Sequence, residues 1–200
     1  TYLFWRCAPP ELRICQHLVE SLRDLVPTLV AVGPHGSTTP QATLRKLRVD
    51  AVVMGECEET VLKFANGNRD LPGLCWWEDG KPQVRGGPQA ASFVDQRPLS
   101  WSDEMVRRHD HHHHRFDAQP LGPGAEVETS RGCPFTCTFC AKENFRNHYR
   151  RRPAESVLTE VSSLQDQGVE YVYFIDEIFL PNEELLQGLV GQDLKFGVQT

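Results

Sequence analysis

The sequence predicts an α/β fold of two domains joined by a linker. In both halves of the 200 residues, strand-like apolar runs alternate with segments of helical periodicity. Such alternation implies a parallel sheet covered by helices on both faces. Between the halves, residues 95–123 are polar and contain three prolines. We therefore expect a first domain over residues 1–95, a linker over 96–123 and a second domain over 124–200.

The first domain is expected to begin with three rounds of strand and helix. The strands are predicted at residues 2–6, 29–32 and 51–54, and the helices at 11–25, 41–47 and 58–65. Ligands of such sheets bind beyond the carboxyl ends of the strands. The loops after the strands at 29–32 and 51–54 are thus the places where we expect a ligand.

A hairpin is predicted at the end of the first domain. Helical periodicity is lost after Leu71, and two strand-like stretches flank Asp79-Gly80, a dipeptide that favours a two-residue hairpin turn. Trp76 and Trp77 are expected to be packing residues of this hairpin.

The second domain is expected to open with a strand around Val127. Pro153 then begins a helix that Gly168 ends, and residues 171–175 form an apolar run typical of a strand buried on both faces. Asp176 and Glu177 follow this strand at its carboxyl end. In a barrel of parallel strands that end carries the active site, although Asp176 could instead cap a helix beginning near Pro181.

Three cysteines follow the first strand of the second domain with the spacing CxxxCxxC. They are Cys133, Cys137 and Cys140. Soft thiolate ligands select zinc, copper(I) or iron–sulfur clusters. Zinc and closed clusters usually take four protein ligands, so either His148 completes a zinc site or one metal position stays open for a substrate or cofactor.

This cysteine loop, with residues 129–134 before it, resembles the radical S-adenosylmethionine (radical SAM) superfamily. The resemblance implies that Cys133, Cys137 and Cys140 bind a [4Fe-4S] cluster whose remaining iron chelates S-adenosylmethionine. It places Phe139, the residue before the third cysteine, near the adenine. It also implies that Asp176 and Glu177 help to hold S-adenosylmethionine, since the form Asp-x-x-Phe after this strand is frequent in the cobalamin-dependent branch.

The loops of the first domain resemble the cobalamin-binding domain of that branch. The matching residues expected to bind cobalamin are Gly33, Pro34, His35, Thr39, Gly55 and Glu56. Two positions depart from the pattern, because Val32 and Cys57 stand where the family has glycine. The resemblance implies a Rossmann-like (flavodoxin-like) cobalamin-binding domain, incomplete at its N-terminus, followed by the first part of a radical SAM (β/α) partial TIM barrel.

The function implied by both resemblances is that of a cobalamin-dependent radical SAM enzyme. Its cofactors would be a [4Fe-4S] cluster, S-adenosylmethionine and cobalamin, and its partners a small-molecule or natural-product substrate and an electron donor such as flavodoxin or ferredoxin. The expected reaction is methylation of an unactivated carbon, and no catalytic side chain is assigned. Two alternatives stay open: a cobalamin-dependent rearrangement, and a non-catalytic zinc-binding interaction protein that uses the three cysteines and His148.

Composition favours a cytoplasmic protein. The net charge of −6 argues against a nucleic-acid-binding protein, although Arg146 and residues 150–152 form a short basic segment. No apolar run reaches the roughly 18 residues of a membrane span, and no signal peptide is visible. Seven cysteines, an odd number, suit a reducing compartment.

Two further features carry expectations. The linker contains the run His109-Asp110-His111-His112-His113-His114, expected to be a solvated loop without an assigned role. The chain starts without methionine inside an apolar run and stops in a strand-like run at 196–200. We therefore expect a piece of a longer protein.

Overall fold

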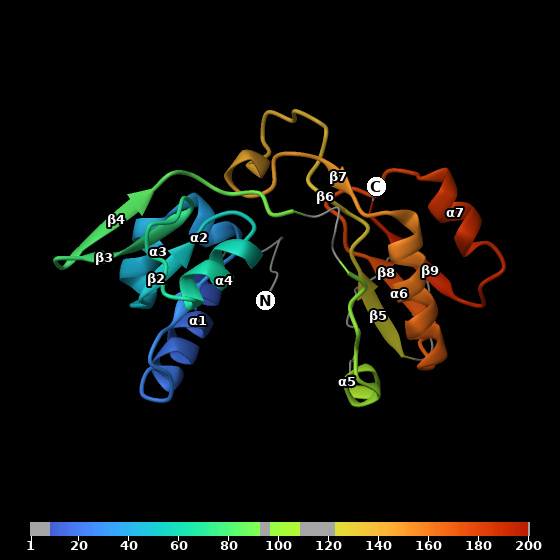
Figure 1. Cartoon of the computed structure of the whole chain (residues 1–200), viewed down its shortest axis with the longest axis horizontal. Coiled ribbons are helices and arrows are strands. Elements are labelled where there is room, and N and C mark those ends of the chain that lie inside the picture. Colours follow the sequence, from blue (N-terminus) through green and yellow to red (C-terminus); the bar gives the residue numbers. More distant parts are fainter. Residues whose placement is uncertain (1–8, 93–96, 109–122, 200) are drawn as a thin grey trace. The chain divides into compact units, whose positions relative to one another are not determined.

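The computed structural model describes residues 9–92, 97–108 and 123–199 (Figure 1). These residues form two compact units. Unit 1 comprises the described part of 1–91 together with 136–147, and unit 2 comprises the described parts of 92–135 and 148–200. The α/β class is confirmed, whereas the strand predicted at 2–6 and the histidine run lie outside the described residues.

Unit 1 contains a mixed four-stranded sheet in the order β1-β2-β3-β4. Its strands are β1 (Val30–Ala31), β2 (Ala51–Val53), β3 (Leu74–Glu78) and β4 (Lys81–Arg85). The helices are α1 (Pro9–Leu22), α2 (Pro34–Thr38), α3 (Pro40–Leu47) and α4 (Glu58–Ala65). Only β1 and β2 are parallel, because the predicted hairpin joins the sheet antiparallel to β2. The helix α2 lies where a loop was expected.

The turn of this hairpin has the geometry that its sequence favours. Asp79 and Gly80 both have positive φ values, of 48° and 73°, as a type I′ turn requires. Glu78 pairs with Lys81 directly across the turn. At the other end of the hairpin, Leu74 and Cys75 of β3 are fully buried against the core.

The core of unit 1 lies on both faces of β2. Val52 packs with Leu44, Leu47, Val49 and Cys75 on one face. Ala51 and Val53 pack with Phe64, Leu71 and Leu74 on the other. Since successive side chains of a strand point to opposite faces, the all-apolar sequence of β2 follows from its central position. This strand therefore fixes the start of the loop that contains Gly55 and Glu56.

Unit 2 contains a parallel sheet in the order β5-β8-β9. Its strands are β5 (Gly124–Val127), β8 (Tyr171–Phe174) and β9 (Lys195–Val198). The helix α6 (Ala154–Asp166) connects β5 to β8, and α7 (Glu183–Leu189) connects β8 to β9. Both helices lie on the same side of the sheet (Figure 1). The predicted strands and the helix after Pro153 are confirmed.

Smaller elements complete unit 2 and the cysteine loop. They are α5 (Asp103–Arg108), β6 (Ser130–Arg131), β7 (Arg150–Arg151) and the 3₁₀ helix η1 (Lys142–Asn144) of unit 1. The strand predicted around Val127 thus ends at this residue. Ser130 and Arg131 instead pair antiparallel with Arg151 and Arg150.

The core of unit 2 lies between α6, α7 and the sheet. Val157, Val161 and Leu164 share one face of α6 and pack with residues of the sheet such as Val172. Phe174 stacks on Phe179 and Phe196, with ring centroids 5.5 Å and 5.7 Å apart. This packing orders the chain directly after β8, where Asp176 and Glu177 lie.

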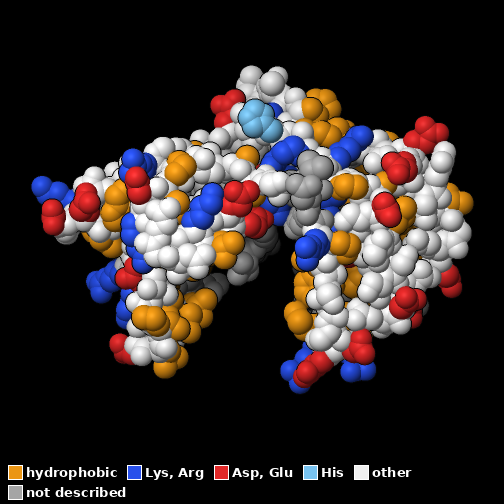
Figure 2. Space-filling view, in the orientation of Figure 1, with side chains coloured by type: hydrophobic (Ala, Val, Ile, Leu, Met, Phe, Trp, Pro, Cys, Tyr) orange, Lys and Arg blue, Asp and Glu red, His pale blue; other side chains and the backbone are white. Residues whose placement is uncertain are grey.

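The outer surface of unit 2 is acidic on its helical side. Acidic side chains outnumber basic ones over α6 and α7 in Figure 2. Glu155, Asp166 and Glu184 are among the residues that line an open groove between these helices. Within the described ranges, no helix is both long and apolar enough to cross a membrane.

Candidate functional site

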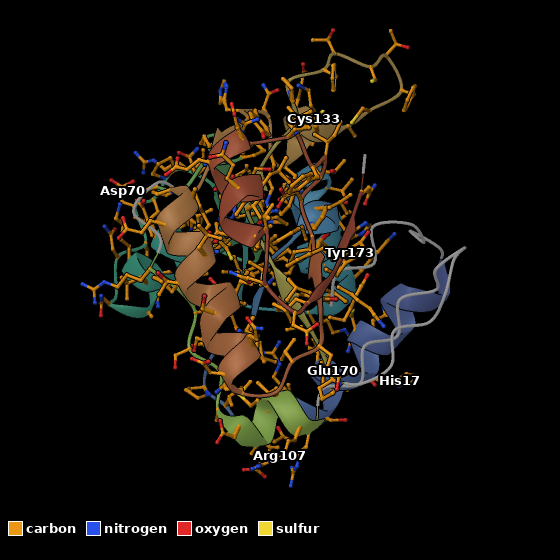
Figure 3. The ribbon with its side chains drawn as sticks, turned by 90° about the vertical axis from the view of Figure 1, so that its right-hand side faces the viewer. His17, Asp70, Arg107, Cys133, Glu170 and Tyr173 are labelled. Carbon is orange, nitrogen blue, oxygen red and sulfur yellow. The ribbon has the colours of Figure 1, made fainter. Side chains whose placement is uncertain are left out.

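The cysteine loop leaves unit 2 at the carboxyl end of its parallel sheet. Cys133 lies at the end of the unit opposite Glu170, the residue before β8, with Tyr173 of β8 between them (Figure 3). The β6–β7 ladder closes the base of the loop. The structure therefore places Cys133 on the edge of the sheet where the sequence predicts the site.

Asp176 lies at the same edge and holds the segment that leads into the loop. One of its carboxylate oxygens accepts hydrogen bonds from the backbone N–H groups of Thr129, at 2.7 Å, and Ser130, at 3.0 Å. The other accepts from the hydroxyls of Ser130, at 2.8 Å, and Thr129. Asp176 does not cap α7, because the residue before that helix is Asn182.

Burial dominates the electrostatics of Asp176. Only 3% of the residue is exposed, and this desolvation raises the pKa of its carboxyl above the ordinary value, while the four hydrogen bonds from Thr129 and Ser130 oppose the rise. The carboxylate is thus held by fixed protein donors rather than by water.

Glu177 holds the next part of the segment. Its carboxylate accepts a hydrogen bond of 2.9 Å from the backbone N–H of Gly132. Gly132 has a φ of 78°, and a Cβ atom there would lie 2.2 Å from the backbone oxygen of His148. Only glycine allows this approach, so the residue before Cys133 is fixed from both sides.

The three cysteines differ in their surroundings. Cys133 belongs to unit 2 and is half-buried, whereas Cys137 and Cys140 belong to unit 1 and are exposed. The backbone N–H of Cys140 donates to the carbonyl oxygen of Cys137 at 3.1 Å, which places both thiols on one turn. Among the described residues, no three His, Cys, Asp or Glu side chains are arranged to share a metal ion.

The donor chemistry of the loop nevertheless fits an iron–sulfur cluster. None of the six described cysteines forms a disulfide, so the thiols remain available as soft ligands. Phe139 lies beside them with 90% of its surface exposed. Its expected contact with adenine stays a prediction, as does the assignment of the three ligands.

The basic segment has a structural role that the sequence did not predict. Arg152 is buried and forms an ion pair of 2.6 Å with Glu160 of α6, and it donates to the backbone oxygen of Glu128 at 2.8 Å. Its backbone N–H also donates to Thr129 at 2.9 Å. The sequence did contain a signal for this ion pair. Glu160 interrupts the apolar face of α6, and a charged side chain on such a face requires a partner.

The two predicted cobalamin loops come together in unit 1. Gly33, with a φ of 108°, precedes α2. The hydroxyl of Ser37 in α2 accepts a hydrogen bond of 2.7 Å from the backbone N–H of Gly55 and donates to the carbonyl oxygen of Gly33 at 2.9 Å. Sequence reasoning missed Ser37, since a serine in a glycine-rich turn gives no distinctive signal.

Gly55 and Glu56 both hold the chain that follows the hairpin. Gly55 has a φ of 80°, and a Cβ atom would lie 2.2 Å from the backbone oxygen of Gln89. Glu56 is 3% exposed and accepts a hydrogen bond of 3.0 Å from the N–H of Ala91. The carboxylate of Glu56 therefore anchors protein backbone, and its expected contact with cobalamin stays a prediction.

The remaining cobalamin candidates lie around α2. Pro34, His35 and Thr39 are exposed. Thr39 follows α2, and its hydroxyl donates to the carbonyl oxygen of His35 at 3.2 Å. The helix η1 of the cysteine loop lies against α2, both being parts of unit 1. The surface offered by α2 is thus polar and close to the cysteine loop.

Comparison with known proteins identifies related sequences. Residues 127–190 match the family model of the Radical SAM superfamily. The chain is 32% identical to the uncharacterized methyltransferase PH0819 of Pyrococcus horikoshii, in an alignment of 165 positions that covers 78% of the present chain. It is 31% identical to the cytidylyl-2-hydroxyethylphosphonate methyltransferase of Streptomyces wedmorensis, in an alignment of 208 positions that covers 84% of the present chain. It covers 34% and 37% of these relatives, about a third of each.

A solved structure has a similar fold. It is the radical S-adenosylmethionine methyltransferase TsrM of Kitasatospora setae with cobalamin and a [4Fe-4S] cluster bound, and it matches with a TM-score of 0.57 at 20% identity. The match covers 84% of the present chain and 34% of TsrM. At this level of identity the likeness concerns the fold.

Proposed function

We propose that the chain, whose residues 127–190 match the family model of the Radical SAM superfamily, is part of a cobalamin-dependent enzyme that methylates an unactivated carbon of a small molecule. In this proposal residues 1–95 form a cobalamin-binding domain of Rossmann-like fold, and residues 124–200, which include the cysteine loop, form the first part of a partial TIM barrel. The methyltransferase names of the two relatives support methylation, and the fold shared with TsrM supports the pairing of the two domains.

The observation that carries the proposal is the position of the cysteine loop. It starts at the carboxyl edge of β5 and β8, where the sites of parallel barrels lie, and its first turn is fixed by Asp176 and Glu177. A buried, hydrogen-bonded segment before Cys133 suits the start of a ligand loop, and Cys137 and Cys140 further along the loop are exposed.

The residues proposed to hold the cofactors are those that the family resemblance implies. Cys133, Cys137 and Cys140 would ligate the cluster, and Phe139 would lie near the adenine of S-adenosylmethionine. Residues of the loops at Gly33–Thr39 and Gly55 would line the cobalamin. When bound, the cluster supplies the electron for reductive cleavage of S-adenosylmethionine, and the cobalamin supplies methyl-group chemistry.

The chain's own contribution is to place and shield these groups. Gly132 and Glu177 fix the backbone before the first thiol, and Ser37 ties the two loops of unit 1 together. The side chains of Val52 and Val53 are fully buried and exclude water from the sheet of unit 1. The buried ion pair between Arg152 and Glu160 links the residue that follows β7 to α6.

The first experiment is anaerobic purification of the full-length protein, with analysis of iron, sulfide and zinc and an electron paramagnetic resonance spectrum with and without S-adenosylmethionine. About four irons and four sulfides per chain, and a spectrum that changes on adding S-adenosylmethionine, are expected. The spectrum should vanish in Cys137→Ala. Stoichiometric zinc without iron or sulfide would overturn the proposal in favour of the interaction protein.

Cobalamin and the reaction outcome are tested next. The protein should bind cobalamin in a one-to-one ratio, and the binding should weaken in Gly55→Ala. With a candidate substrate, transfer of a deuterated methyl group from S-adenosylmethionine to the product supports methylation. An isomerised product of unchanged mass indicates a rearrangement instead.

A further inference from the structure

Asp176 has no acceptor position left for a ligand. A carboxylate offers about four lone-pair sites, two on each oxygen. In unit 2 all four are used: two by the N–H groups of Thr129 and Ser130, and two by the hydroxyls of the same residues. The side chain is also 3% exposed. An ammonium group could bind Asp176 only by displacing these donors.

The same contacts bind Asp176 to the start of the cysteine loop. Thr129 and Ser130 are buried, and they lie four and three positions before Cys133. On the other side, the carbonyl oxygen of Thr129 accepts a hydrogen bond of 2.9 Å from Arg152, and Ser130 pairs with Arg151 across the ladder. The segment before Cys133 is therefore held by Asp176 on one side and by β7 and Arg152 on the other.

The carboxylate of Glu177 fixes a further residue before Cys133. Glu177 accepts from the N–H of Gly132, the residue adjacent to Cys133. Phe179, the last residue of the Asp-x-x-Phe form, is buried against Phe174 and keeps the chain after β8 in place. Asp176, Glu177 and Phe179 of this sequence form thus all make contacts within unit 2.

We propose that Asp176 is a positioning residue, which fixes Thr129 and Ser130 and thereby the backbone of the first cluster ligand, and that it does not contact S-adenosylmethionine. The role in cluster binding rests on the proposed function. It replaces the ligand contact that the family resemblance implies for this side chain. Recognition of the amino group of S-adenosylmethionine then falls to other groups at the carboxyl edge.

A positioning role and an ion pair with an ammonium group respond differently when Asp176 is replaced by asparagine, its neutral isostere. In Asp176→Asn the amide oxygen can still accept from the two N–H groups, and the hydroxyls of Thr129 and Ser130 can rotate to accept from the amide nitrogen, because a hydroxyl is both donor and acceptor. Asp176→Ala removes all four bonds. A positioning role therefore survives in the asparagine variant, whereas an ion pair with an ammonium group is lost in both variants.

The test begins with the metal-free full-length protein. Hydrogen exchange of the peptide spanning residues 129–132 and the alkylation rate of Cys133 are compared in wild type, Asp176→Asn, Asp176→Ala and the control Asp193→Asn, which changes an exposed aspartate of the same unit. We expect both rates to rise about tenfold or more in the alanine variant and to stay within about threefold of wild type in the others. Unchanged exchange in Asp176→Ala would overturn the proposal.

The second part uses the protein reconstituted with iron and sulfide. We expect Asp176→Asn to keep its affinity for S-adenosylmethionine, measured by spectral titration, within about threefold of wild type, and to lose iron to a chelator at a similar rate. A tenfold loss of that affinity with normal exchange at residues 129–132 would show that Asp176 is a ligand. Should Asp176→Ala not fold, the asparagine variant alone decides between these results.

The two parts separate this inference from the proposed function. If the wild-type protein binds no cluster, the proposed function fails, while the exchange measurements on the metal-free protein still test the contacts of Asp176. If the cluster binds and the exchange of residues 129–132 does not depend on Asp176, the positioning role fails alone.

Discussion

The hydroxyl of Ser37 accepts a hydrogen bond of 2.7 Å from the backbone N–H of Gly55. This contact joins α2, which follows β1, to the loop that follows β2, and the two residues lie 18 positions apart in the sequence. Both residues are buried, so no water replaces the bond if it is lost. The side chain of Ser37 therefore couples the position of α2 to that of the loop.

Ser37→Ala should destabilise unit 1 by about 1–3 kcal/mol, because it leaves the buried N–H of Gly55 without its acceptor. The free energy of unfolding, from urea titration, measures this cost. Thr38→Ala is the matched control, since Thr38 is exposed and its hydroxyl bonds only to a carbonyl oxygen of its own helix. Equal stabilities of the two variants would contradict the coupling.

Gly55→Ala should cost far more than Gly67→Ala, although both glycines have positive φ values of 80° and 92°. A Cβ atom at Gly55 would lie 2.2 Å from the backbone of Gln89, whereas nothing lies within 4 Å at Gly67. We expect about 2–6 kcal/mol at Gly55, from strain and overlap together, and about 1–2 kcal/mol at Gly67. Thermal unfolding of the two variants is the measurement, and similar shifts would refute the steric argument.

Arg152→Met should destabilise unit 2 by about 3–5 kcal/mol, because it leaves the buried carboxylate of Glu160 without its cation. Adding Glu160→Leu removes that charge as well. The double variant should therefore recover part of the loss, and a double-mutant cycle by urea unfolding measures the coupling. Strict additivity of the two changes would argue against an energetically important pair.

Asp176 should make the stability of the metal-free protein depend on pH. Because burial raises its folded-state pKa above the ordinary value of 3.8, the folded protein binds this proton more tightly than the unfolded chain. Relative to Asp176→Asn, the wild type should gain stability as the pH falls from neutral towards 3.8 and should keep that gain below it. Denaturant unfolding of both proteins at several pH values tests the sign, and the opposite trend would mean that the four hydrogen bonds outweigh burial.

Cys75 should resist alkylation while the exposed cysteines react. Burial raises the pKa of Cys75 to about 11, although Arg45 opposes the rise, and the side chain is fully buried. In the metal-free protein at pH 8, iodoacetamide should modify Cys137 and Cys140 and leave Cys75 unmodified until the protein unfolds. Peptide mass spectrometry identifies the modified residues. Early modification of Cys75 would show that β3 opens in the native state.

Much of the fold could be predicted because its signals are local. The apolar run at Tyr171–Phe174 and the Asp79-Gly80 turn each determine an element by their own residues. The antiparallel pairing of β3 with β2 could not be predicted, since it depends on contacts between distant residues. The same holds for the four hydrogen bonds of Asp176, because a carboxylate after a strand looks alike in sequence whether it binds a ligand or the backbone.

The family resemblance supplied the candidate site residues, and the structure shows what these residues contact within the chain. The place of Cys133 after the strand around Val127 predicted that it lies at the carboxyl edge, as it does in the structure (Figure 3). Glu56 and Asp176, which the resemblance assigns to cofactors, hold the backbone at Ala91 and Thr129, and their cofactor contacts stay predictions. These assignments depend on hydrogen-bond geometry, which residue type and spacing do not contain.

The closed base of the cysteine loop has a consequence for protein engineering. Gly132 packs against His148, and β6 pairs with β7, so both ends of the loop are fixed independently of what lies between them. Lengthening a closed loop is cheap, since each doubling adds only about 0.6 kcal/mol of closure entropy. Segments grafted between Cys140 and His148 should therefore leave the base of the loop closed beside an unchanged first ligand, but they would replace η1, which lies against α2, and the buried Arg146.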